Sequence, residues 1–171
     1  MSEAHVLVAG IGNIFFGDDA FGVEVVQRLA RRPQPAGVEV KDFGIRGFDL
    51  AYALMDGPQL AILIDALPRG GLPGTLYVLD PDLGQLGDED SLFDPHSMHP
   101  LNVLRLVRTL GGTCPPLRVV GCEPGMLGTD EEPATALSPP VAAAVPEAVR
   151  IIEKLVREAC ESLAVPAGQA H

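Results

Sequence analysis

The sequence predicts an α/β fold, a three-layer α/β/α sandwich around a five-stranded, mostly parallel sheet with one antiparallel strand. Short apolar runs rich in β-branched residues alternate along the chain with segments of helical periodicity, which is typical of this class. One connection between successive apolar runs is too short for a parallel crossover, which predicts the antiparallel strand. We expect residues 1–171 to form a single domain, with a frayed tail at 165–171.

The predicted strands are five short apolar runs, at residues 5–10, 38–43, 60–66, 75–80 and 117–122. The third run, LAILIDA, is apolar until Asp65 and should form the central strand. Only residues 67–74 join it to the fourth run, whereas a parallel crossover needs about a dozen residues or more. The fourth strand should therefore run antiparallel.

Four segments with helical patterns follow or separate these strands, at residues 20–32, 47–56, 100–110 and 139 to about 163. In the first segment Phe21, Val25 and Leu29 recur every four residues and should form its buried face. The sequence Ser138-Pro139 is typical of a helix start. A proline inside the last segment, at position 146, should kink that helix or restart it.

The composition restricts the partners and the compartment. The chain has 12 Lys plus Arg against 23 Asp plus Glu, a net charge of −11, which excludes nucleic acid and an anionic membrane surface as partners. Its three cysteines share no CxxC spacing, as expected in a reducing compartment. No basic signal region and no apolar run long enough to span a membrane is present in the sequence. We expect a cytoplasmic monomer.

Acidic side chains follow two predicted strands that should be neighbours. The loop GIGNIFFGDDAFG, residues 10–22, carries Asp18 and Asp19 after the first strand, and Asp65 ends the third strand. In a flavodoxin-like strand order, 2-1-3, these strands lie about 4.8 Å apart, so their carboxylates could share one ligand. Because paired carboxylates repel phosphate, this glycine loop favours a cation.

Two histidines should reach the same edge of the sheet. The antiparallel strand ends at the opposite edge, so residues 81–99 must cross back before the helix at 100–110 begins, and this return ends at His96 and His99. Two carboxylates and one imidazole form an incomplete coordination sphere that suits zinc or nickel and leaves positions open for substrate. The His-x-x-His spacing is not the HExxH pattern of zinc peptidases.

Other readings of these residues are weaker. A dinucleotide-binding GxGxxG motif needs glycine at the place of Phe15. Asp18 is expected to serve as a helix N-cap or a loop residue. Ser97 lies outside any GxSxG elbow, and Cys122 is expected to be a small buried residue. Glu123 is a candidate for a further carboxylate.

Taken together, these segments resemble the nickel–iron hydrogenase maturation endopeptidases. The matching pieces are GIGNIFFGDDAFG, ILIDA, the D-P-H-x-M-x-P-x-x-V-L stretch at 94–104 and RVVGCEPGML, in the order that the family has them. The resemblance implies a five-stranded sheet between helices in a single peptidase domain. It also implies the removal of the C-terminal extension of the hydrogenase large-subunit precursor after nickel insertion, with bound nickel as the recognition mark.

The resemblance also implies site residues. Carried over, the family's metal-contacting set is Asp19, Asp65 and His96, with Asp19 and Asp65 as the catalytic acids and no Ser or Cys nucleophile. His96 stands eight residues before Leu104, the spacing that the family shows. The implied metal is nickel carried by the precursor, which zinc or cadmium could replace in a crystal. The enzyme would then be a hydrolase of the aspartyl-protease type.

One segment departs from the family pattern. The family often has G-T-x-G after the second strand, where this chain has Gly44-Ile45-Arg46-Gly47 and therefore lacks the hydroxyl. We expect Gly44, Gly47 and His99 to bind substrate. Two alternative functions remain, a nickel-binding assembly chaperone that leaves its partner uncut and a nucleotide-binding module.

Overall fold

The computed structural model describes residues 4–81, 100–129 and 131–164. The elements in chain order are β1 (Val6–Ile11), the 3-10 helix η1 (Asp18–Ala20), α1 (Phe21–Ala30), β2 (Val38–Gly44), α2 (Gly47–Met55), β3 (Leu60–Ala66), β4 (Leu76–Leu79), α3 (Pro100–Thr109), β5 (Leu117–Cys122) and α4 (Pro139–Ala164). Every predicted strand and helix is confirmed to within two residues at each end, and η1 is the one element among these that the sequence pattern did not predict.

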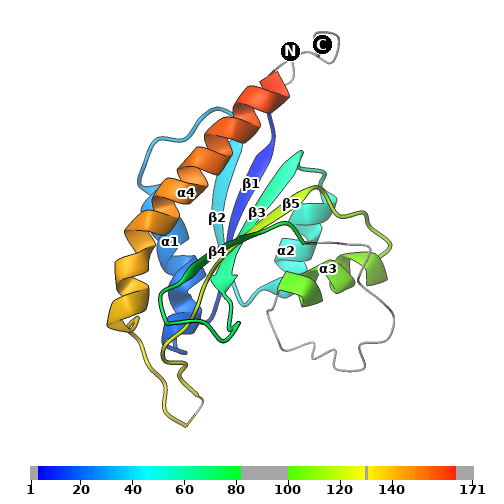
Figure 1. Ribbon diagram of the computed structural model, residues 1–171. Helices are drawn as coiled ribbons and strands as arrows, with labels where there is room; N and C mark the ends of the chain where they lie inside the picture. Colours follow the sequence, from blue (N-terminus) through cyan, green and yellow to red (C-terminus); the bar gives the residue numbers. More distant parts are fainter. Residues whose placement is uncertain (1–3, 82–99, 130, 165–171) are drawn as a thin grey trace.

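The strands form one sheet with the order β2-β1-β3-β5-β4 (Figure 1). Strands β2, β1, β3 and β5 are parallel, and β4 pairs antiparallel with β5. The predicted α/β/α sandwich, the 2-1-3 neighbourhood and the antiparallel strand are therefore confirmed. The predicted return segment, residues 81–99, lies outside the described residues apart from its first residue.

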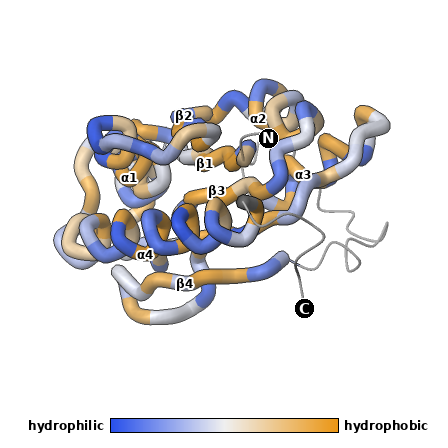
Figure 2. The backbone as a smooth tube through the Cα atoms, turned by 90° about the horizontal axis from the view of Figure 1, so that it is seen from above, coloured by the Kyte–Doolittle hydropathy of each residue, from blue (hydrophilic) through white to orange (hydrophobic). Residues whose placement is uncertain are grey.

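Two layers of apolar side chains fill the two faces of the sheet. Alternation along β1 divides its residues between them: Val6 and Val8 pack with α1 and α4, whereas Leu7 and Ala9 pack with α2 and α3. Seen from above, α1 and α4 lie on one side of the strands and α2 and α3 on the other (Figure 2). The predicted buried face of α1 is confirmed, since Phe21 is fully buried and Leu29 is 1% exposed.

Helix α4 is continuous through Pro146, so of the two predicted alternatives, a kink or a restart, the restart does not occur. Proline lacks the N–H that would bond to the carbonyl of Ala142, but both residues are exposed, so water can solvate that carbonyl. Val145, Val149 and Ile152 pack the opposite face of the helix into the core, which stabilises the helix across the break in its bonding.

None of the helices in the described part of the chain combines the length and the apolar composition that a membrane crossing requires.

Candidate functional site

The carboxyl ends of the four parallel strands meet at one edge of the sheet. At this edge Gly10 of β1 is in register with Ile64 of β3, and Asp65, the next residue, is in register with Gly121 of β5. The loop that leaves β1 crosses the same edge before α1 begins. Side chains from the β1 loop and from the tip of β3 can therefore meet there.

Two glycines allow the β1 loop to lie close against the tip of β3. Gly12 has φ +146°, and a Cβ at this position would overlap the carbonyl oxygen of Asp19. A Cβ on Gly22, in the first turn of α1, would overlap the carbonyl oxygen of Ile64. Gly10 lies within β1, where its missing side chain gives room to Val26 of α1.

Asp19 lies half-buried in η1. Its Oδ2 accepts a hydrogen bond of 2.9 Å from the backbone N–H of Asn13, in the same loop. Burial raises the pKa of Asp19 above its ordinary value, and the bond from Asn13 only partly offsets this. The contribution of Asn13 could not be predicted from the sequence, because any residue can supply a backbone N–H.

Asp65 is 4% exposed, and its Oδ1 accepts a 2.8 Å bond from the backbone N–H of Ala66. Burial raises the pKa of Asp65 well above its ordinary value, and repulsion from the charge of Asp19 is the second, smaller cause. The structure therefore brings the two predicted acids within electrostatic reach of each other. We call Asp19 and Asp65 the acidic pair. Such a pair favours either a shared proton or a bound cation.

The predicted imidazole partners, His96 and His99, lie outside the described residues. Within residues 4–81, 100–129 and 131–164, no three His, Cys, Asp or Glu side chains are arranged to hold a metal ion. The acidic pair offers two carboxylate ligands of the kind that divalent cations accept, and a complete site would need at least one further ligand.

Asp18, the neighbour of Asp19, has a different environment. It is fully buried, and its carboxylate accepts hydrogen bonds of 2.6–2.7 Å from the backbone N–H groups of Gly125, Met126 and Ser138 and from the Ser138 hydroxyl. Burial alone would raise the pKa of Asp18, but these hydrogen bonds outweigh it, so the pKa is lowered. We call Asp18, Gly125, Met126 and Ser138 the Asp18 clamp.

The expected N-cap role of Asp18 is wrong, because Gly17 is the N-cap of η1 and no side chain bonds to that cap. Asp18 is nevertheless a structural residue, as expected. Its hydrogen bonds join the β1 loop to the segment between β5 and α4. Backbone bonds support the same junction, from Gly17 N–H to the carbonyl of Ala134 and from Asp18 N–H to that of Met126.

Two further residues at this edge are structural. Cys122 is fully buried, and burial, with the charges of Asp18 and Glu123, raises the pKa of its thiol to about 12, so it is protonated at neutral pH. Glu123 accepts bonds from the backbone N–H groups of Arg69 and Gly70 and from the Tyr77 hydroxyl. The amide of Arg69 in particular lowers the pKa of Glu123, whose carboxylate holds the β3–β4 connection.

A cavity of about 330 Å³ opens beside the β1 loop. Its lining comes from the β1 loop, α1 and the end of β2 with its following loop, namely Gly12, Asn13, Ile14, Phe15, Val23, Asp42, Phe43, Gly44, Ile45 and Arg46. Gly44, which is expected to bind substrate, lines this cavity and has φ +53°; its role in substrate binding stays a prediction. Gly47 is the first residue of α2 and lies outside this lining.

Comparisons with known proteins agree on one family. A family model described as hydrogenase maturation protease matches residues 23–155. The hydrogenase 2 maturation protease of Escherichia coli (strain K12) is 31% identical over 156 residues, which cover 90% of this chain and 92% of that protein.

Solved structures are similar over nearly the whole chain. The hydrogenase-maturating endopeptidase HybD from E. coli superimposes with a TM-score of 0.71 at 30% identity, covering 90% of this chain and 93% of HybD. The hydrogenase 2 maturation peptidase from a Thaumarchaeota archaeon gives a TM-score of 0.68 at 30% identity, covering 90% of this chain and 98% of that one.

Proposed function

The chain belongs to the hydrogenase maturation proteases, and from this premise we propose that it removes the C-terminal extension of the hydrogenase large-subunit precursor after nickel insertion. The precursor, with its nickel, is the substrate in this proposal. The acidic pair recognises the nickel, and His96 completes the set of ligands.

The observation that carries this proposal is the acidic pair itself. A half-buried and a buried carboxylate that repel each other at one edge of the sheet are destabilising unless a proton or a cation compensates their charge. A divalent cation presented by the precursor would relieve that repulsion, and the affinity for the loaded precursor would then exceed that for the empty one. Relief of the repulsion between the two carboxylates is therefore the physical basis that we propose for nickel recognition.

Cleavage requires the proton transfers of peptide-bond hydrolysis. A water oxygen bonds to the carbonyl carbon, the C–N bond breaks, and the departing nitrogen takes up a proton. One carboxylate of the pair accepts the proton of the attacking water and then donates a proton to the nitrogen. The raised pKa of Asp65 suits this role, because it brings the group closer to neutral pH. The nickel of the precursor positions the scissile bond and can polarise its carbonyl.

The test is a cleavage assay with purified precursor in nickel-loaded and nickel-free forms, read by mass spectrometry. We expect the wild-type protein to shorten the loaded precursor only, and Asp19→Asn and Asp65→Asn to leave both forms intact. Asp56→Asn is the matched control, since this exposed aspartate follows α2 at the opposite end of the sheet. Equal cleavage of the nickel-free precursor would contradict recognition by nickel.

The same assay separates the alternatives. A nickel-binding chaperone would bind the loaded precursor and leave its mass unchanged. A nucleotide-binding module would cut neither form, and a dinucleotide would raise its melting temperature.

A further inference from the structure

We infer that the cavity beside the β1 loop is a specificity subsite, which receives an apolar side chain of the precursor within about two residues of the scissile bond. This inference rests on the proposed function and deepens it, because it states which part of the substrate determines whether it is accepted.

The position of the cavity connects it to the acidic pair. Asn13 lines the cavity and also donates its backbone N–H to Asp19 Oδ2 at 2.9 Å. Gly12 N–H bonds to the carbonyl of Gly44 at 3.0 Å, which joins the β1 and β2 sides of the cavity wall. The cavity therefore begins at the residue that bonds to Asp19, and a polypeptide whose scissile bond lies over the acidic pair can place a neighbouring side chain at the mouth of the cavity, since an extended residue spans about 3.3 Å.

The lining favours an apolar occupant. Phe43 is fully buried and Val23 is 1% exposed, so they form the base, while Ile14, Phe15 and Ile45 are 48–61% exposed and form the rim. The carboxylate of Asp42 disfavours an acidic occupant by repulsion. A volume of about 330 Å³ is at the lower end of ligand pockets, which suits one side chain rather than a cofactor.

Arg46, the one cation among the described residues of the lining, bonds to other groups of the protein. Its guanidinium bonds to the backbone carbonyls of Asp42 and Phe43, and it lies 3.7 Å from the carboxylate of Asp49. It is therefore poorly placed to attract an anionic ligand, and the apolar rim decides what binds.

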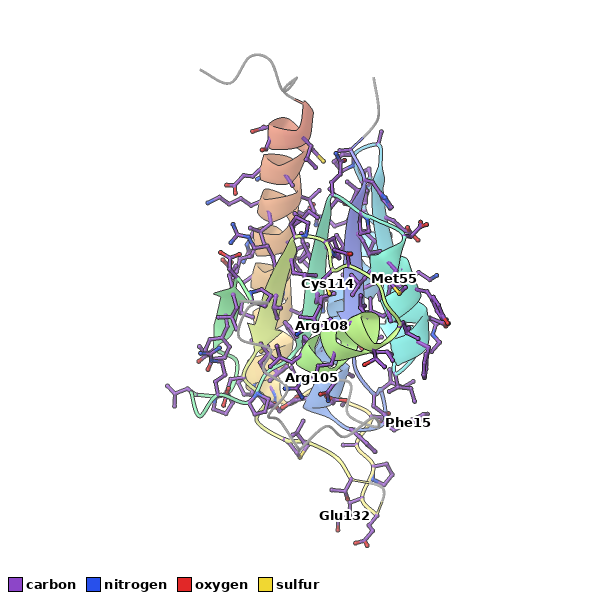
Figure 3. The ribbon with its side chains drawn as sticks, turned by 90° about the vertical axis from the view of Figure 1, so that its right-hand side faces the viewer. Phe15, Met55, Arg105, Arg108, Cys114 and Glu132 are labelled. Carbon is purple, nitrogen blue, oxygen red and sulfur yellow. The ribbon has the colours of Figure 1, made fainter. Side chains whose placement is uncertain are left out.

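The rim is held in place by the backbone. Phe15 N–H bonds to the Asn13 side-chain oxygen, and the carbonyl of Phe15 accepts a bond from Ala134 N–H, both at 2.9 Å. Phe15 nevertheless exposes 56% of its surface, at the end of the molecule that also carries Glu132 (Figure 3). Two further exposed apolar side chains, Phe48 and Tyr52, lie one helical turn apart on α2, the helix that follows Arg46, and each is about 60% exposed. Exposed apolar side chains that gather around a cavity mark a binding surface.

The test introduces a negative charge at the rim of the cavity and, separately, a positive charge in the substrate. Ile45→Glu and, as a second variant, Phe15→Glu should lower kcat/KM for the loaded precursor by about tenfold or more, mainly through KM, because the subsite loses its affinity for an apolar group. Leu72→Glu is the control, an 81% exposed leucine in the connection from β3 to β4, the outermost strand on the side of the sheet away from β2 and the cavity. It should cleave like the wild type, and melting temperatures verify that all three variants fold.

Precursors in which each apolar residue within two positions of the cut is replaced in turn by Lys complete the test. For each enzyme, we divide kcat/KM for the Lys precursor by kcat/KM for the unchanged precursor. At one substrate position, this ratio should be about tenfold higher for Ile45→Glu than for the wild type. If the wild type cuts the precursor but Ile45→Glu and Phe15→Glu cut it equally well, the subsite is wrong and the proposed function stands. Loss of activity without any Lys rescue also contradicts the subsite. If the wild type cuts no precursor, both proposals fail.

Discussion

Asp18 and Asp19 are adjacent in the chain and have opposite environments. Asp18 is saturated with hydrogen bonds from the segment between β5 and α4, and its pKa is lowered. Among the described residues, Asp19 accepts one bond, from Asn13, lies near the buried acid Asp65, and has a raised pKa. The Asp18 clamp stabilises the folded loop. The acidic pair destabilises the folded protein, and a bound cation would offset this destabilisation. Two neighbouring carboxylates therefore have different environments, and the proposed function assigns a role in catalysis to Asp19 alone.

The largest expected effect is on catalysis. Asp65→Asn keeps the size of the side chain and an oxygen for Ala66 N–H but removes the charge and the transferable proton, and Asp19→Asn does the same for its partner. Each should slow cleavage of the loaded precursor about 1,000-fold, or about 4 kcal/mol in activation free energy. Single-turnover assays measure this. A tenfold loss or less would mean that the pair is not the catalytic centre.

The same substitution at Asp18 should act on stability instead. In Asp18→Asn, an amide N–H₂ replaces an oxygen that accepts bonds, and donors of the buried clamp lose their partner. We expect a loss of about 3 kcal/mol in the free energy of unfolding, measured in urea. Cleavage by the folded fraction should fall less than in the acidic-pair variants. A loss below about 0.5 kcal/mol would remove the distinction between the two sites.

The acidic pair could be predicted from the sequence, whereas the Asp18 clamp could not. Convergence of Asp19 and Asp65 could be predicted, because parallel strands end at one edge and a 2-1-3 order makes β1 and β3 neighbours. The Asp18 clamp could not be predicted, since its donors are 107–120 residues away and most are backbone groups without a sequence signature. Glu123 was missed as a structural residue for the same reason. The roles given to His96 and His99 stay predictions.

Stability should respond to pH with opposite signs at the two sites. Because the pKa of Asp65 is raised, the folded protein holds this proton at pH values where the unfolded chain, with a pKa of about 3.9, has released it. Stability therefore falls as pH rises from about 4 through the raised pKa of Asp65, by about 1.4 kcal/mol for each pH unit between the folded and unfolded pKa values. Asp65→Asn should remove this loss, so the variant is more stable than the wild type at neutral pH.

At Asp18 the pKa is lowered, so its contribution to stability is complete above about pH 4 and is lost as pH falls through the lowered value. Urea unfolding of the wild type, Asp18→Asn and Asp65→Asn from about pH 3 to about pH 8 measures both slopes. The two variants should differ from the wild type in opposite directions at neutral pH. A change of both in the same direction would contradict the assignment of one site to structure and the other to function.

The smallest expected effect concerns Ser138, whose hydroxyl donates to Asp18 at 2.6 Å. Ser138→Ala removes this one bond and leaves the three backbone donors of the clamp in place. We expect a loss of about 1 kcal/mol in the free energy of unfolding, with cleavage unchanged. If Ser138→Ala costs as much as Asp18→Asn, the backbone donors contribute little and the clamp has been described wrongly.

The most direct test of the central claim is a carbon-13 NMR titration of the aspartate carboxyl groups in the folded wild-type protein, with and without nickel ion. Asp18 should titrate below the ordinary aspartate pKa and Asp65 well above it, and nickel should move the signals of Asp19 and Asp65 while leaving Asp18 unchanged. An Asp65 that titrates like an exposed aspartate, or a nickel effect centred on Asp18, would contradict the account.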